Sequence, residues 1–290
     1  MPRHRASGSD GSLTMSPPVS QAGSGYLQVG HVAGRSALLG SRATNPLRLL
    51  TPRARGPSVW AYTSNFGGGM LAGDRTRLEA VIEAGARCFL GTQASTKIYR
   101  NPRRIPCRHE LFANVHDDAL LVMAPDPVQC FADSIYEQRQ QFLLAPTASL
   151  VLVDWMSAGR LARGERWQFL RYSSRNEIER AGKKLLVDSL LLDSASGLLD
   201  SKFRGGKFNC LATVVLLGAG VSGEAQEILA WAAAQPLEPT APVIFCASPL
   251  AEGAILRFAG ASTASVARSI HDRIGFVRQW LEDDPWCRKW

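Results

Sequence analysis

One glycine-rich segment, Gly218-Ala-Gly220-Val-Ser-Gly223, has the G-x-G-x-x-G spacing that lets a backbone approach the phosphates of a dinucleotide. It follows a predicted strand and precedes a predicted helix, as a dinucleotide-binding turn does. The next predicted strand ends in Cys246-Ala-Ser248, without the acidic residue that would bind the ribose, and too few residues follow to complete a doubly wound sheet. We therefore interpret Gly218–Gly223 as a tight turn, and expect no tightly bound cofactor.

Side chains that bind transition metals are few and scattered. No C-x-x-C pair indicates a zinc or redox site, and we interpret the cysteines as reduced thiols of a cytoplasmic protein. His109 and His116 are expected to bracket a hairpin at the surface. The chain also lacks a phosphate-binding G-x-x-x-x-G-K-[ST] loop, a G-x-S-x-G elbow and an H-E-x-x-H motif. The full set is five histidines (His4, His31, His109, His116, His271) and six cysteines (Cys88, Cys107, Cys130, Cys210, Cys246, Cys287).

Carboxylates leave an enzymatic alternative open. Asp154, with Glu165 or Asp188, would be the acid/base pair of a β-rich hydrolase acting on carbohydrate. That reading requires the two carboxylates to face each other in an open cleft.

A basic segment precedes these carboxylates in the chain. Lys97, Arg100, Arg103, Arg104 and Arg108 occur without an intervening acid, and the whole chain has a net charge of +8. Such a loop could bind an acidic patch on a protein partner. A basic nucleic-acid-binding module is the other alternative, but the aromatic residues do not alternate with the basic ones as stacking platforms would require. We therefore expect no nucleic-acid partner.

The elements that would position the candidate site residues are predicted to be mostly strands. Residues 1–25 are rich in Ser, Gly and Pro and are predicted to be a disordered tail. Residues 26–290 are predicted to form a single β-rich domain, because short segments of strand character are separated by Gly, Pro or Asp. The clearest segments are Ser58–Ser64, Arg77–Ile82, Arg87–Thr92, Ile135–Leu143, Ala148–Asp154, Arg166–Tyr172 and Lys184–Leu192.

The last part, about residues 205–290, changes character. Its patterns predict a β-α-β-β-α order, ending in one long helix over Thr263–Leu281 with Ser262 or Thr263 at its N-cap. The fold class is thus mostly β, with stacked or coiled sheets and a C-terminal layer of two helices. No apolar run is long enough to cross a bilayer and no signal peptide is present, so we expect no membrane partner. The preceding elements are Leu211–Leu217, Glu224–Ala234, Pro242–Ala247 and Ala254–Phe258.

Three segments, in order, resemble the urease accessory protein D family. They are the glycine-rich Phe66-Gly-Gly-Gly-Met-Leu-Ala-Gly-Asp74, then Thr92-Gln-Ala-Ser-Thr-Lys-Ile-Tyr-Arg100, and then Leu144-Ala-Pro146 with Ala148-Ser-Leu-Val-Leu-Val-Asp154. The chain departs from the family around Pro125-Asp-Pro127, where the usual acidic and aromatic residues are missing, and no site residue is assigned there.

The resemblance implies a non-catalytic urease maturation chaperone that helps deliver nickel to the urease active site. Its implied partners are the urease apoprotein, a helical accessory adaptor (UreF) and a nickel-carrying accessory GTPase (UreG), with nickel as transient cargo. The residues matching the family's polar passage are Asp74, Thr96, Asp154 and Asp188. Oxygen ligands bind Ni(II) more weakly than imidazole or thiolate, which suits passage of an ion. Lys97, Arg100, Arg103 and Arg104 are the expected partner-binding residues.

Overall fold

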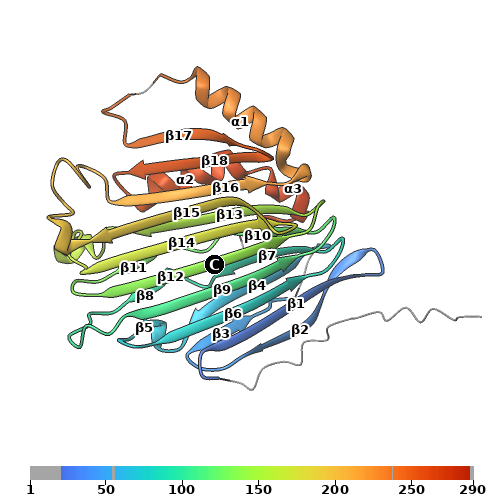
Figure 1. The fold of residues 1–290 in the computed structure, drawn as a ribbon, viewed down its shortest axis with the longest axis horizontal. Coiled ribbons are helices and arrows are strands. Elements are labelled where there is room, and N and C mark those ends of the chain that lie inside the picture. Colours follow the sequence, from blue (N-terminus) through green and yellow to red (C-terminus); the bar gives the residue numbers. More distant parts are fainter. Residues whose placement is uncertain (1–20, 54–55, 237, 288–290) are drawn as a thin grey trace, which may run out of the picture.

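The computed structural model describes residues 21–53, 56–236 and 238–287. Within these ranges the chain forms one seven-stranded and one eleven-stranded sheet, which face each other, with helices on the outer side of the larger sheet (Figure 1). The strands of the seven-stranded sheet are β1 (Ser24–Val32), β2 (Arg35–Ala43), β6 (Arg75–Ile82), β9 (Cys107–Val115), β12 (Ile135–Leu144), β14 (Arg171–Arg180) and β15 (Lys183–Asp193).

The eleven-stranded sheet has a long path of eight strands and three short additions. The path is β3 (Leu47–Leu50), β4 (Val59–Asn65), β7 (Arg87–Thr92), β10 (Leu120–Met123), β13 (Ser149–Ser157), β16 (Cys210–Leu217), β18 (Gly253–Gly260) and β17 (Val243–Leu250). The additions are β5 (Gly69–Met70), β8 (Lys97–Ile98) and β11 (Val128–Cys130).

The middle of the chain winds as a coil between the two sheets. β4, β7, β10 and β13 are parallel neighbours in one sheet, and β6, β9, β12 and β14 are parallel neighbours in the other. The chain passes from one sheet to the other through the short strands β5, β8 and β11. The coils differ in length, which explains why the sequence has no repeat of fixed period. The predicted mostly β, coiled-sheet architecture is confirmed.

Antiparallel strands extend this coil at its C-terminal side. β16 pairs with β13, and β18 and β17 follow. The helices α1 (Ser222–Ala234), α2 (Thr263–Ile274) and α3 (Val277–Leu281) cover the outer face of these strands (Figure 1). Among the residues described, no helix combines the length and apolar character needed to cross a membrane.

The long predicted helix is wrong in one respect, since it is interrupted after Ile274. The amides of Arg278 and Gln279 donate to the carbonyl oxygens of Gly275 and Phe276, which is the tighter i to i+3 pattern of a 3₁₀ turn. Glycine has a low helix propensity, which favours the break at this position. The predicted cap is present, because the Ser262 hydroxyl accepts a hydrogen bond from the Ser265 amide.

Three other predictions from the sequence differ from the structure. The strand over Arg166–Tyr172 begins only at Arg171, because Trp167 has a φ of 55° and buries its ring beside Phe169. His109 and His116 do not bracket a hairpin, since β9 is flanked by parallel strands on both sides.

The N-terminal boundary also differs. β1 begins at Ser24, inside the predicted tail, while residues 1–20 lie outside the described residues.

Buried apolar side chains form three clusters. One lies between the sheets and includes Leu78, Leu111 and Leu152. A second lies under the helices. The third, around Tyr136 and Phe169, occupies the end of the coil at β5, β8 and β11. The two interior clusters are not continuous, and the side chains that separate them are polar.

Candidate functional site

The two interior apolar clusters are separated by polar side chains. Along several strands, the residues that face the interior are apolar near both ends and polar in the middle. On β12 the buried inward series is Tyr136, Gln138, Gln140 and Phe142. Side chains on alternate residues of a strand face the same side, so Gln138 and Gln140 both face the interior. We call the following set the polar belt: His109 on β9, Gln138 and Gln140 on β12, Ser174 and Asn176 on β14, and Asp154 on β13.

The strand register aligns the members of the polar belt across the smaller sheet. Gln138 is paired with His109 on one side and with Ser174 on the other. Gln140 is paired with Asn176 in the next inward row. Because parallel strands keep their side chains in register, the polar positions form a continuous strip rather than isolated sites.

Asp154 reaches this strip from the opposite sheet. Its Oδ1 accepts a hydrogen bond from Gln138 Nε2 at 2.9 Å, and its Oδ2 accepts from Ser174 Oγ at 2.5 Å and Asn176 Nδ2 at 2.8 Å. Burial raises the pKa of Asp154, while these three hydrogen bonds act in the opposite direction and the neighbouring Asp188 adds to the rise. The belt therefore has one central carboxylate held by neutral donors.

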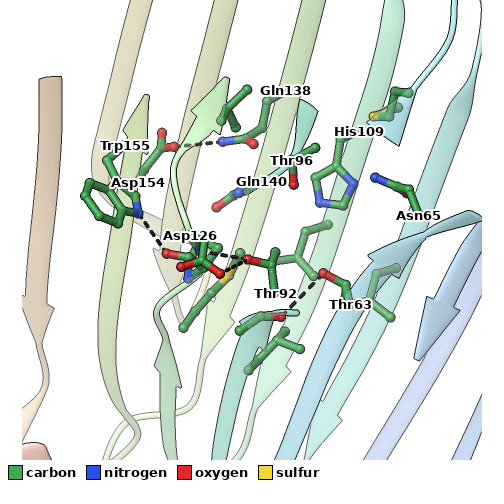
Figure 2. Close-up of a pocket in the computed structure, with 18 of the residues that line it drawn as sticks. Thr63, Asn65, Thr92, Thr96, His109, Asp126, Gln138, Gln140, Asp154 and Trp155 are labelled. Carbon is green, nitrogen blue, oxygen red and sulfur yellow. Dashed lines mark hydrogen bonds between the residues drawn. The ribbon is translucent and has the colours of Figure 1, made fainter. Parts of the chain in front are cut away.

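A cavity of about 50 Å³ lies beside Asp154 between the two sheets. Figure 2 shows that polar side chains from both sheets converge on it, including Gln138 and Gln140 from one and Thr92 and Asp154 from the other, with Asp126 from the loop between β10 and β11. Within the described part of the chain, the buried Gln140 Oε1 has no hydrogen-bond partner, so it is an acceptor available to a guest. Such an acceptor costs free energy when it is left unpaired, which favours occupancy of the cavity by water.

A second cavity, of about 270 Å³, lies on the other side of Asp154. It is bounded by the edge strand β15 and by β13, β16 and β18, and both Asp154 and Asp188 line it. Arg257 Nη2 donates to Asp188 Oδ1 at 2.7 Å. The Arg257 side chain is 54% exposed and that of Asp188 is 11% exposed, so the ion pair lies at the solvent side of this cavity. Asp154 is thus common to the two cavities.

His109 is not the surface residue that the sequence predicted. Its ring lines the first cavity, and its Nδ1 lies 2.8 Å from Thr76 Oγ1. Burial lowers the pKa of His109 to about 4, so the imidazole is neutral near pH 7 and can act as a metal ligand. His116 is exposed, as expected.

The four residues predicted for a polar passage are not all together. Thr96 and Asp154 line the first cavity, and Asp154 and Asp188 line the second. Asp74 lines neither cavity; its Oδ2 accepts a hydrogen bond from the Leu71 amide at 2.7 Å and closes the glycine-rich turn.

The carboxylates of the hydrolase alternative do not form one open pair. Glu165 lines neither cavity, because it is bound to Arg160 and to the Ala132 amide. Asp154 and Asp188 share the second cavity, but Asp188 is paired with Arg257. Across residues 21–53, 56–236 and 238–287, no three His, Cys, Asp or Glu side chains are grouped closely enough to hold a metal ion.

The cysteines near the polar belt are not poised as thiolates. Burial raises the pKa of Cys107 to about 11 and also raises the pKa of Cys130. A thiol binds metal as the thiolate, so these protonated groups are poor initial ligands.

The glycine motif forms a structural turn. A Cβ on Gly218 would lie 2.3 Å from the Ala148 carbonyl oxygen, and one on Gly220 would lie 2.8 Å from Ser149 Oγ. The strand before the turn, β16, is antiparallel to its neighbours and is not part of a parallel nucleotide-binding unit. Gly218 and Gly220 are therefore explained by close packing against Ala148 and Ser149, at the start of β13.

Most of the polar belt was not identified from sequence. Gln138, Gln140, Ser174 and Asn176 are ordinary polar residues in strands, and their inward direction depends on register. The sequence does contain one sign of the inward direction of the two glutamines. Gln138 and Gln140 lie on the same alternate positions of the strand as the apolar-facing Tyr136 and Phe142.

Comparison with known proteins gives consistent matches. A family model described as UreD urease accessory protein matches residues 21–290. A urease accessory protein UreD from Sorangium cellulosum is 45% identical over 271 residues, covering 93% of this chain and 85% of the relative. One from Anaeromyxobacter is 41% identical over 269 residues, covering 92% and 90%. A urease accessory protein D from Oryza sativa subsp. indica is 31% identical over 293 residues, covering 91% and 95%.

Proposed function

Because the chain belongs to the UreD urease accessory protein family, we propose that it is a non-catalytic chaperone of urease maturation that helps deliver nickel to the apoenzyme. In this proposal it acts in the cytoplasm and binds apo-urease, a helical adaptor and a nickel-carrying GTPase. Nickel is its cargo and not a resident cofactor.

The observation that carries the nickel part of the proposal is the position of Asp154 between two cavities. In the first cavity the ion would contact Thr96, His109 and Gln140. It would then contact the Asp154 carboxylate, which lines both cavities, and finally Asp188 in the second cavity. A cation inside a protein is stabilised by such oxygen donors, which replace part of its hydration shell. Among the described residues that line these two cavities, His109 contributes the only imidazole.

The donor set supports transit rather than storage. Ni(II) binds imidazole and thiolate more tightly than carboxylate, amide or hydroxyl oxygen. A series of mainly oxygen sites therefore holds the ion weakly at each step. The Asp154 carboxylate would add the negative charge that favours entry of a dication.

The proposal is tested with apo-urease produced with the adaptor and the GTPase, with and without this chain. After addition of nickel, the metal content per active site and the urease activity are measured. We expect this chain to co-purify with apo-urease and both readouts to depend on it. Equal nickel content and activity in its absence would overturn the proposed function.

A further inference from the structure

The glycine-rich turn and the basic loop, which are separate segments of the sequence, form one surface. The turn strand β5 pairs in parallel with β8, with Gly69 opposite Lys97 and Met70 opposite Ile98. Tyr99 Oη donates to the Gly67 carbonyl oxygen at 3.1 Å, and Arg103 Nη2 donates to the Ala72 carbonyl oxygen at 3.2 Å. These strands lie together at the left end of the molecule in Figure 1.

The centre of this surface is apolar and exposed. Phe66 is 59% exposed, Leu71 is 60% exposed and Ile105 is 45% exposed. The loop carrying Ile105 is fixed from beneath, because the buried Asn101 side chain donates to the Ile105 carbonyl oxygen and accepts from its amide. Exposed apolar side chains held by a rigid backbone are typical of binding surfaces, since little entropy is lost when they are covered.

The rim of the surface is basic. We call the whole surface the turn patch; it consists of Phe66, Leu71, Ile105, Arg48, Lys97, Arg100, Arg103 and Arg104. The Arg48 guanidinium lies 5.2 Å from the centre of the Phe66 ring. Arg100 lies 3.5 Å from Asp133, but no described carboxylate lies within ion-pair distance of Lys97, Arg103 or Arg104. The patch therefore has uncompensated positive charge around an apolar centre.

The turn patch lies next in sequence to residues that form the wall of the first cavity. Three of its residues directly follow residues that line the first cavity: Phe66 follows Asn65, Leu71 follows Met70, and Lys97 follows Thr96. A protein that covers the patch would therefore contact the backbone that shapes the cavity.

We propose that the turn patch docks an acidic protein segment that carries an exposed apolar side chain. This inference rests on the proposed function, because the partner would be a protein of the urease maturation assembly. The apolar centre would supply most of the affinity, and the basic rim would speed association and fix orientation. An apolar centre favours protein over nucleic acid, because most contacts to nucleic acid are made with charged phosphates and polar sugars.

The test measures the dissociation constant of the full chain for purified apo-urease and, separately, for the purified adaptor–GTPase pair. The test variants are Leu71→Ser, Ile105→Ser and the double variant Arg103→Glu, Arg104→Glu. The controls are Phe203→Ser, which changes an 87% exposed residue elsewhere, and Arg268→Glu on α2. All substituted side chains are exposed, and thermal unfolding checks that each variant folds as wild type.

We expect at least one partner to bind Leu71→Ser and the double variant about tenfold or more weakly, with wild-type affinity in both controls. Affinity for both partners that is unchanged by every patch variant would overturn the patch but leave the proposed function standing. A wild-type chain that binds neither partner would overturn the proposed function and the patch with it. Salt-sensitive binding of poly(U) RNA that is lost in the double variant, with protein binding unchanged, would identify a nucleic-acid surface instead.

Discussion

Arg257 Nη2 lies 2.7 Å from Asp188 Oδ1, so a cation of β18 holds a carboxylate of β15 at the solvent side of the second cavity. The pair joins the edge of the smaller sheet to the larger sheet, across the space that Asp154 also lines. In the proposed nickel path, this ion pair would make Asp188 a weak ligand while the pair is closed, and Arg257 would be an electrostatic barrier to a dication.

The first prediction follows from that barrier. Arg257→Gln is expected to raise the initial rate of nickel incorporation into urease about twofold or more, because it removes a positive charge next to the proposed path. Arg257 is half-exposed but Asp188 is buried, so the unpaired carboxylate should also lower the thermal midpoint, and thermal unfolding checks that the variant folds. The measurement is nickel bound per active site against time in the purified assembly.

The matched control for this variant is Arg278→Gln. Arg278 is 50% exposed and pairs with Asp284 at 3.0 Å, but it lines neither cavity. Its substitution should leave the nickel rate unchanged. A slower rate in Arg257→Gln, or equal rates in both variants, would contradict the barrier.

The second prediction concerns the pH dependence of stability. The pKa of folded His109, about 4, lies below its ordinary value of 6.5. Between these values the unfolded chain binds a proton that the folded chain does not, so this contribution to stability is present above about pH 6.5 and is lost as the pH falls toward 4.

His109→Gln should therefore reduce the fall in the thermal midpoint between pH 6.5 and pH 4, relative to wild type. His116→Gln, at an exposed position directly after β9, should keep the wild-type slope. Differential scanning fluorimetry across this range checks both. An identical slope in wild type and His109→Gln would show that the imidazole is not held neutral by burial.

The third prediction separates two glycines of the G-x-G-x-x-G turn. Gly218 has a φ of 113° and no room for a Cβ, whereas a Cβ on Gly223, in α1, would point into open space. Gly218→Ala should lower the free energy of unfolding by at least about 1 kcal/mol. Gly223→Ala should raise it by no more than about 0.5 kcal/mol, because alanine is the better helix former but Gly223 lies in the first turn of α1.

Urea unfolding of the two glycine variants tests this difference. A nucleotide-binding role for the turn would instead make both substitutions alter nucleotide binding with little effect on unfolding. Equal stability of Gly218→Ala and wild type would contradict the packing account.

Local patterns predicted most of the strands and the C-terminal order, because alternation and helical spacing are visible over a few residues. β7 was predicted with its exact bounds, and β12 and β15 to within a few residues. The pairing of those strands was not predicted in detail, since parallel neighbours are contributed by different coils. The sequence therefore predicts a hairpin at β9, where the structure has a strand with parallel neighbours on both sides.

The candidate site was predicted only where the resemblance supplied it. Thr96, Asp154 and Asp188 line the cavities, but Asp74 closes a turn. His109 was assigned to the surface because sequence alone does not show that Thr76 and Gln138 flank it in the sheet. The register between distant strands, rather than residue type, decides which polar side chains meet.

The most direct test of nickel transit is the nickel content of urease matured with Asp154→Ala. The control is Asp117→Ala, an exposed carboxylate in a turn, and Asp154→Asn checks that any effect comes from loss of charge and not from loss of packing. We predict that both Asp154 variants assemble with apo-urease normally but give about half or less of the wild-type nickel per active site, because the shared carboxylate of the two cavities is lost. Normal nickel content in Asp154→Ala, with normal assembly, would contradict passage through this interior.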